Sequence, residues 1–161
     1  MKTIGMLGGM TWHSTVEYYR LINAGVQTRL GGNHSARCIL YSVEFAEVER
    51  RQHAGEWLAL AGFMTDAAKR VAEAGADFLV ICANTMHQMA GAIEAAVPIP
   101  LLHIADAAAG AIKKQGLQTV GLLGTRFTME QDFYRTRLEK QHGLQVLIPG
   151  EGDRQITHDI I

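Results

Sequence analysis

The chain has 161 residues, of which 48% are hydrophobic and 19% charged, and its formal net charge is -1. This length suits a single domain with a real core, and the composition excludes a disordered or fibrous protein. Lysine and arginine are scattered along the chain, so the positive surface of a nucleic-acid-binding protein is not indicated. No apolar stretch reaches the roughly 20 residues that a membrane span needs, and no partner in a membrane is expected.

The first predicted elements are a strand and a helix. Ile4–Leu7 has the pattern of a buried strand and ends at Gly8-Gly9, while Ser14 and Glu17 have the spacing of a capping box that opens a helix. The apolar stripe of an amphipathic helix follows: Tyr18, Leu21, Ile22 and Val26. A glycine pair, Gly31-Gly32, ends this helix.

A second strand is predicted at Cys38–Val43, and a charged segment leads from it to a long helix. The apolar stripe of that helix consists of Trp57, Leu60, Met64, Ala68 and Val71. Phe78–Cys82 is a continuous apolar run, which predicts a strand covered on both faces. The run turns polar at Ala83-Asn84-Thr85, where ligands bind in open α/β sheets.

The same alternation continues to the end of the chain. The predicted elements are a helix at Met86–Ala96, a short strand at Leu101-Leu102, an amphipathic helix over Ile104–Ile112, a buried strand at Thr119–Leu123, a helix around Tyr134 and Leu138, a strand at Val146–Ile148 and a helix start at Gly152-Asp153. Alternating strands and helices predict an α/β fold with parallel sheets flanked by helices. Because the chain stops at Ile160-Ile161 inside an amphipathic pattern, we expect it to be the N-terminal part of a longer protein.

Polar residues gather at the ends of the predicted strands. The loops concerned are Gly8-Gly9-Met10-Thr11, Cys82-Ala83-Asn84-Thr85 and Gly124-Thr125-Arg126-Phe127-Thr128. Backbone N–H groups near helix starts and threonine hydroxyls suit a small carboxylate. For any one loop a tight turn or a helix cap is the simpler explanation, but three loops at one edge favour a ligand crevice.

Other kinds of site have little support. The Gly5–Gly9 segment does not match Gly-x-Gly-x-x-Gly, and no phosphate loop occurs, so a nucleotide site is not expected. The histidines lack the spacing of metal ligands, which predicts no metal site. His87 and His103 follow strand ends, where capping is a commoner role than catalysis.

Both cysteines lie in apolar runs. Cys38 and Cys82 are expected to be reduced, structural thiols, which favours a cytoplasmic protein over a disulfide-linked secreted one. A nucleophilic role for Cys82 with His87 is the less favoured alternative.

Several of these segments resemble the aspartate/glutamate racemase superfamily, and most closely its broad-specificity bacterial amino-acid racemases. The segments are Met1–Met10, Cys82–His87, His103–Asp106, Gly121–Thr128 and Thr128–Tyr134. Their order along the chain makes the likeness specific, and it extends from Met1 to Ile161.

The resemblance implies two similar α/β domains that face each other across a substrate crevice. It divides this chain into residues 1–103, a flavodoxin- or Rossmann-like first domain that is incomplete, and residues 104–161, the truncated start of a second. It implies an amino acid as the small-molecule partner and chemistry without pyridoxal phosphate, metal or any other cofactor. Family members often pair, so a homodimer is an option.

In the resembling proteins one thiol from each domain flanks the substrate α-carbon. Inversion needs a base on one face and an acid on the other, in a dry pocket that stabilises the carbanion. Here the first thiol position is Ala83, and the second motif, Gly-Cys-Thr-Glu, does not occur. The catalytic groups are therefore unknown, and this chain alone is expected to be inactive.

The positions that grip the substrate do carry over by resemblance. Asn84, Thr85, Thr125 and Thr128 match contacts to the carboxylate and amino group, and Met10 and Thr11 match a loop that lines the pocket. Aspartate-specific members place an arginine after the second strand, where this chain has Glu44–Arg50. A glutamate there would repel a second carboxylate, which favours a neutral or basic amino acid.

Three functions remain open at this point. The first is a cofactor-independent amino-acid racemase or epimerase. The second is one-base chemistry of the decarboxylase kind on the same scaffold, which a small residue at position 83 would suit. The third is a module that binds a small carboxylate without converting it.

Overall fold

The computed structural model describes residues 1–161, and they form two compact units that are considered separately. Unit 1 consists of Met1–Ala83 and Met89–Leu102, and unit 2 of Asn84–Gln88 and His103–Ile161. The assignment of domains to residues 1–103 and 104–161 stays a prediction.

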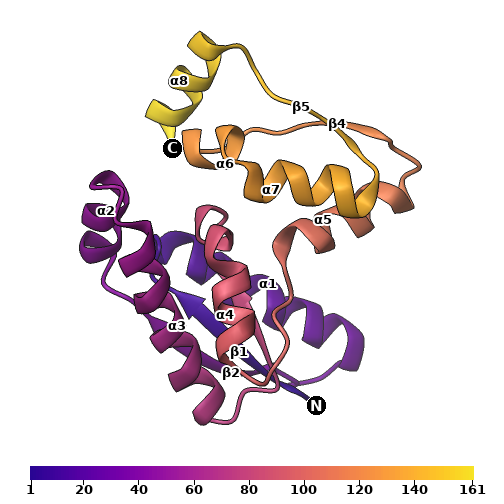
Figure 1. Cartoon of the computed structure of the whole chain (residues 1–161). Coiled ribbons are helices and arrows are strands. Elements are labelled where there is room, and N and C mark those ends of the chain that lie inside the picture. Colours follow the sequence, from indigo (N-terminus) through magenta and orange to yellow (C-terminus); the bar gives the residue numbers. More distant parts are fainter. The chain divides into compact units, whose positions relative to one another are not determined.

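Unit 1 is a parallel sheet with helices on both faces (Figure 1). Its elements are β1 (Thr3–Gly8), α1 (Trp12–Leu30), β2 (Arg37–Ser42), α2 (Phe45–His53), α3 (Trp57–Glu73), β3 (Phe78–Ile81) and α4 (Ala90–Ala96). The strands lie in the order β2-β1-β3, and Leu101 forms one further parallel bridge with Leu79 of β3. This is the start of a flavodoxin-like strand order, so the predicted α/β fold is confirmed.

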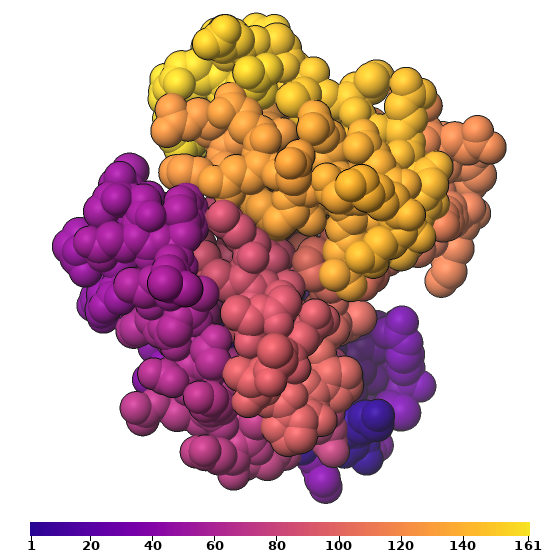
Figure 2. Space-filling view, viewed as in Figure 1, coloured from indigo at the N-terminus to yellow at the C-terminus, as the bar shows by residue number.

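The two faces of the sheet are covered by different helices. Cys82, Met6 and Val80 form a buried cluster against which Tyr18 and Ile22 of α1 pack. The opposite face meets α3, so closely that a Cβ on Gly5 would lie 2.5 Å from Val71 Cγ1. Helices α2, α3 and α4 contact one another in sequence, as the violet to pink atoms of Figure 2 show.

The predicted stripe of α3 is confirmed, whereas that of α1 is only partly so. Leu60, Met64 and Ala68 are completely buried, but Leu21 of α1 is 58% exposed. The capping box is wrong. Helix α1 begins at Trp12, so Ser14 lies inside it, and the Ser14 hydroxyl donates to Cys82 O at 2.7 Å instead. This hydrogen bond joins the start of α1 to the end of β3.

Unit 2 holds the remaining elements around a second, smaller sheet. They are η1, a 3-10 turn (Thr85–Met89, its last residue in unit 1), α5 (Ile104–Lys114), β4 (Thr119–Gly121), α6 (Arg126–Glu130), α7 (Asp132–Thr136), the π-helical turn η2 (Arg137–Gln141), β5 (Gln145–Leu147) and α8 (Glu151–Ile160). Strands β4 and β5 pair in parallel. Ala105, Ala109, Tyr134 and Leu138 form the centre of the core.

Three predicted elements of this region differ from the structure. The strand at Thr119–Leu123 is shorter and not fully buried, because the sheet has only two strands and Leu123 is 69% exposed. The helix predicted over Met86–Ala96 is divided into η1 and α4. The helix around Tyr134 is interrupted at Gln131, whose ψ of 149° is extended.

No helix has the length and apolar character that crossing a bilayer would require.

Candidate functional site

Three threonine hydroxyls of unit 2 meet at one point. Thr85 Oγ1 lies 3.1 Å from Thr125 Oγ1 and 3.4 Å from Thr128 Oγ1, and the latter two are 3.3 Å apart. Thr85 and Thr128 are buried, while Thr125 is partly exposed. We call this group the hydroxyl triangle. Three residues predicted for the site from the sequence therefore lie in contact, although two of them are 40 or more positions from the third.

Local geometry explains how α6 supplies two of the three hydroxyls. Thr125 is the N-cap of α6, and its Oγ1 accepts the Thr128 N–H at 3.4 Å. Thr128 comes three residues later and therefore lies on the same side of the first helical turn. Gly124 permits this packing, since a Cβ there would lie 3.1 Å from Thr128 Cβ.

The third hydroxyl is held by a turn. The backbone N–H of His87 donates to Asn84 O at 3.0 Å, and this closes the turn that presents Thr85. Asn84 itself is exposed. Each hydroxyl can donate one hydrogen bond and accept two, so three hydroxyls in mutual contact can turn their protons toward an incoming acceptor. An ionised carboxylate, which only accepts hydrogen bonds, is chemically matched to such a group.

The two predicted residues of the first loop belong to unit 1. Met10 is 7% exposed, and Thr11 O accepts a hydrogen bond from the Thr15 hydroxyl at 3.3 Å, with Ser14 Oγ 2.9 Å away. The Gly9 N–H donates to Thr15 Oγ1 at 2.9 Å, so this donor is already used within the fold. The glycine pair thus serves the tight turn. That Met10 and Thr11 line a substrate pocket stays a prediction.

Ala83, where the resembling proteins have a thiol, lies at the carboxyl end of β3. Ala83 is partly buried there, one residue after Cys82. Cys82 is completely buried, and burial together with the nearby Cys38 raises the pKa of its thiol to about 12. A thiol with this pKa is protonated at neutral pH and is a poor base. The structure therefore agrees with a packing role for Cys82.

The two histidines singled out from the sequence are both buried in unit 2, with ring centroids 4.5 Å apart. His103 is the N-cap of α5, and its Nδ1 accepts the Ala105 N–H at 3.2 Å. Burial, with the neighbouring His87, lowers the pKa of His103 to about 4. His103 is therefore neutral at pH 7, as its capping role requires.

A charged cluster beside α5 has no clear signal in the sequence. The Asp106 carboxylate accepts two hydrogen bonds of 2.7 Å from Arg137 and contacts His142 Nε2 at 2.8 Å. Arg137 chiefly, with His142, holds the pKa of Asp106 well below its usual range. The partners are 31 and 36 residues away along the chain, so only the tertiary structure brings them together. The cluster ties α5 to η2.

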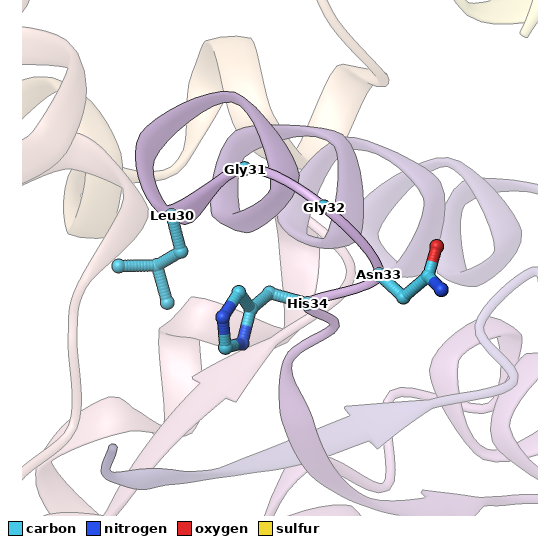
Figure 3. A pocket seen from close by; sticks show the side chains of 5 residues that line it. All are labelled: Leu30, Gly31, Gly32, Asn33 and His34. Carbon is cyan, nitrogen blue, oxygen red and sulfur yellow. The ribbon is translucent and has the colours of Figure 1, made fainter.

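A shallow hollow of about 300 Å³ lies elsewhere, at the loop between α1 and β2. It is lined by the consecutive residues Leu30–His34, and Figure 3 shows the Asn33 side chain pointing away from those of Leu30 and His34. Because this loop precedes β2, it lies at the amino ends of the strands, whereas the predicted site residues follow their carboxyl ends. No group of three or more histidine, cysteine, aspartate or glutamate side chains is arranged to hold a metal ion.

Comparisons with known proteins identify the fold. A Yersinia pestis protein provisionally described as an Asp/Glu racemase is 52% identical, with a TM-score of 0.94 over 99% of this chain and 70% of that chain. An aspartate racemase homologue from Pyrococcus horikoshii OT3 is 33% identical, with a TM-score of 0.84 over 100% of this chain and 70% of that one. The Picrophilus torridus aspartate racemase, 19% identical with a TM-score of 0.76 over 99% of this chain and 72% of its own, shares the fold.

These likenesses define an α/β protein of the amino-acid racemase class. The sequence model described as Asp/Glu/Hydantoin racemase matches residues 7–161. The chain belongs to this family, and the resemblance seen in the sequence is confirmed.

Proposed function

We propose that the hydroxyl triangle binds the α-carboxylate of an amino acid, in a protein whose reaction is cofactor-independent proton transfer at the α-carbon. The observation that carries this proposal is the approach of Thr85, Thr125 and Thr128 Oγ1 to within 3.1–3.4 Å of one another. Hydroxyls from two separate segments can donate hydrogen bonds to one shared acceptor. Capping of α6 explains the position of the Thr125 hydroxyl but not those of Thr85 and Thr128. Membership of the racemase family supports the reaction class.

The nature of residue 83 limits which chemistry this chain performs by itself. Removal of an α-proton needs a strong base in a dry site. Ala83 has no ionisable group, and the pKa of Cys82, about 12, keeps its thiol protonated. We therefore propose that the chain binds its amino acid and does not invert it without further groups.

We further propose a neutral or basic amino acid as the ligand. Glu44 caps α2 by accepting the Ala46 N–H at 3.1 Å, and Glu47 pairs with Arg51 at 2.6 Å. In the resembling aspartate-specific proteins an arginine of this segment holds the second carboxylate, and a glutamate in its place would repel that group. A panel that contains lysine, alanine and aspartate tests this preference directly.

The binding test uses thermal denaturation of the chain with each L- and D-amino acid. A ligand that binds only the folded state raises the melting temperature. Thr128→Val removes one hydroxyl of the triangle at nearly constant volume and should abolish the rise. Thr157→Val is the matched control, because that hydroxyl donates only to Asp153 O within α8. If no amino acid stabilises the chain, or if both variants respond like the parent, the proposed binding is wrong.

The reaction is tested by following exchange of the α-hydrogen for deuterium by NMR. No exchange together with stabilisation is the expected result for this chain. Exchange with inversion would show a complete racemase, and exchange with retention would show the one-base chemistry that Ala83 also suits. Ala83→Cys supplies a thiol where the family has one, so inversion that appears only in this variant would support the position assigned to residue 83.

A further inference from the structure

His87 has polar contacts on both ring nitrogens within unit 2. The side chain is 2% exposed. Ile104 N–H, at the first residue of α5, donates to His87 Nε2 at 3.2 Å, and His87 Nδ1 lies 3.3 Å from Asn84 O. The ring therefore lies between the start of α5 and the turn that presents Thr85.

These contacts determine the tautomer of the ring. A backbone N–H can only donate, so Nε2 must be the unprotonated, accepting nitrogen. A carbonyl oxygen can only accept, so Nδ1 must carry the proton. Both contacts are satisfied at once only by the neutral Nδ1–H form. A charged imidazolium would leave Ile104 N–H facing another donor.

The Asn84 carbonyl thus receives two hydrogen bonds, one from the His87 backbone N–H and one from its ring. The first closes the turn, as in any turn of this type. The second comes from the imidazole ring, whose other nitrogen accepts the Ile104 N–H. The ring therefore joins the turn to α5, which begins 17 residues further along the chain. Thr85 is the next residue after Asn84, so its hydroxyl is placed by the orientation of this carbonyl.

We propose that His87 is a positioning residue, whose Nδ1–H holds the Asn84-Thr85 turn so that the Thr85 hydroxyl completes the triangle. It touches neither the substrate nor the reacting atoms. The inference rests on the proposed function, since the property it explains is the affinity of the triangle for an amino acid.

The tautomer is tested first, without any ligand. Long-range ¹H–¹⁵N spectra of the full chain labelled in its histidines distinguish a protonated from an unprotonated ring nitrogen. The His87 signals are identified by their loss in His87→Gln. The Nδ1–H form is expected at pH 7. An Nε2–H form or an imidazolium would overturn the proposal.

Two substitutions then separate the two contacts of the ring. Gln at this position places an amide oxygen near the site of Nε2 but nothing near Nδ1, so His87→Gln keeps an acceptor for Ile104 N–H and releases Asn84 O. Asn places an amide N–H near the site of Nδ1 but is too short to reach Ile104. His103→Asn is the control, because Asn is itself a good N-cap for α5.

The amino acid that most stabilises the parent chain is used as the probe, and its dissociation constant is measured by calorimetry. His87→Gln should weaken binding about five- to tenfold, which corresponds to one hydrogen bond, with little change in melting temperature. His87→Asn should bind within about twofold of the parent but melt lower. His103→Asn should bind like the parent.

Failure of the positioning role and failure of the proposed function give different results. If His87→Gln binds like the parent while Thr128→Val binds weakly, His87 has no positioning role and the hydroxyl triangle still binds. If both His87 variants lose affinity in proportion to their melting temperatures, the role is merely structural and the inference is wrong. If the parent binds no amino acid, the proposed function and this inference fail together.

Discussion

Adding a single methyl group at Gly124 tests the hydroxyl triangle from outside it. A Cβ at Gly124 would lie 3.1 Å from Thr128 Cβ and 3.2 Å from Thr128 Cγ2. Both distances are closer than ordinary van der Waals contact, so Thr128 must move by a few tenths of an ångström. Because Gly124 has no left-handed backbone conformation, the Gly124→Ala variant tests this contact and not backbone strain.

The size of the effect follows from how long the hydrogen bonds of Thr128 already are. Its hydroxyl lies 3.4 Å from Thr85 Oγ1 and 3.3 Å from Thr125 Oγ1, and its N–H lies 3.4 Å from Thr125 Oγ1. A displacement of a few tenths of an ångström takes such contacts beyond hydrogen-bonding distance. Losing two of them costs about 1–3 kcal/mol, offset by about 0.5–1 kcal/mol from the stiffer unfolded chain. The net loss is therefore about 0–2.5 kcal/mol, with a centre near 1 kcal/mol.

The assay is urea denaturation, followed by titration with the best amino acid of the panel. Gly124→Ala should unfold at lower urea and bind about tenfold more weakly. Gly110→Ala is the control, because nothing lies within 4 Å of a Cβ at that position in α5 and the variant should gain about 0.5–1 kcal/mol. If Gly124→Ala is as stable as the control and binds like the parent, the triangle is not as closely packed as the geometry indicates.

Three further predictions concern ionisable groups. Asp106→Asn should lower the free energy of unfolding by about 2 kcal/mol at pH 7, since Arg137 loses its two short hydrogen bonds to a carboxylate. Because the pKa of Asp106 is depressed, this contribution is complete above about pH 4 and declines progressively as the pH falls below that value. Equal losses at pH 7 and pH 3 in urea denaturation would contradict this. The pKa of His103 is about 4, below the unfolded value, so the parent should lose stability as the pH falls from about 6.5 to 4. His103→Asn should show a flatter profile over that range, and an unchanged slope would refute the assignment. Cys82, with a pKa of about 12, should resist alkylation by iodoacetamide in the folded chain at pH 8, and Cys38 should react first. Mass spectrometry of the alkylated chain checks the order. Labelling of Cys82 before Cys38 would refute the burial of Cys82.

The sequence alone determined the elements whose signal is periodic. The stripe Leu60, Met64 and Ala68 predicted the buried face of α3, and the apolar run Phe78–Cys82 predicted a strand covered on both faces. Such patterns can be recognised because a helix or strand repeats its buried positions at a constant interval, whatever covers them. The parallel α/β fold followed from the order of these elements.

Local patterns were misleading where a side chain has a distant partner. Ser14 has the spacing of a helix cap, yet its hydroxyl donates to Cys82 O, 68 residues away. The break at Gln131, which separates α6 from α7, likewise could not be recognised from the spacing of the apolar residues. In both cases a contact or backbone conformation set by the surrounding fold prevails over a propensity worth about 1 kcal/mol.

The sequence also placed Thr85, Thr125 and Thr128 at strand ends, but only the tertiary structure decided that their hydroxyls touch. Likewise the Asp106 cluster and the contact between His87 and Ile104 join segments that no spacing rule connects. The physical reason is the same throughout. Periodicity records which face of an element avoids water, whereas a hydrogen bond needs two atoms within about 3.5 Å, and that depends on how all the elements between them pack.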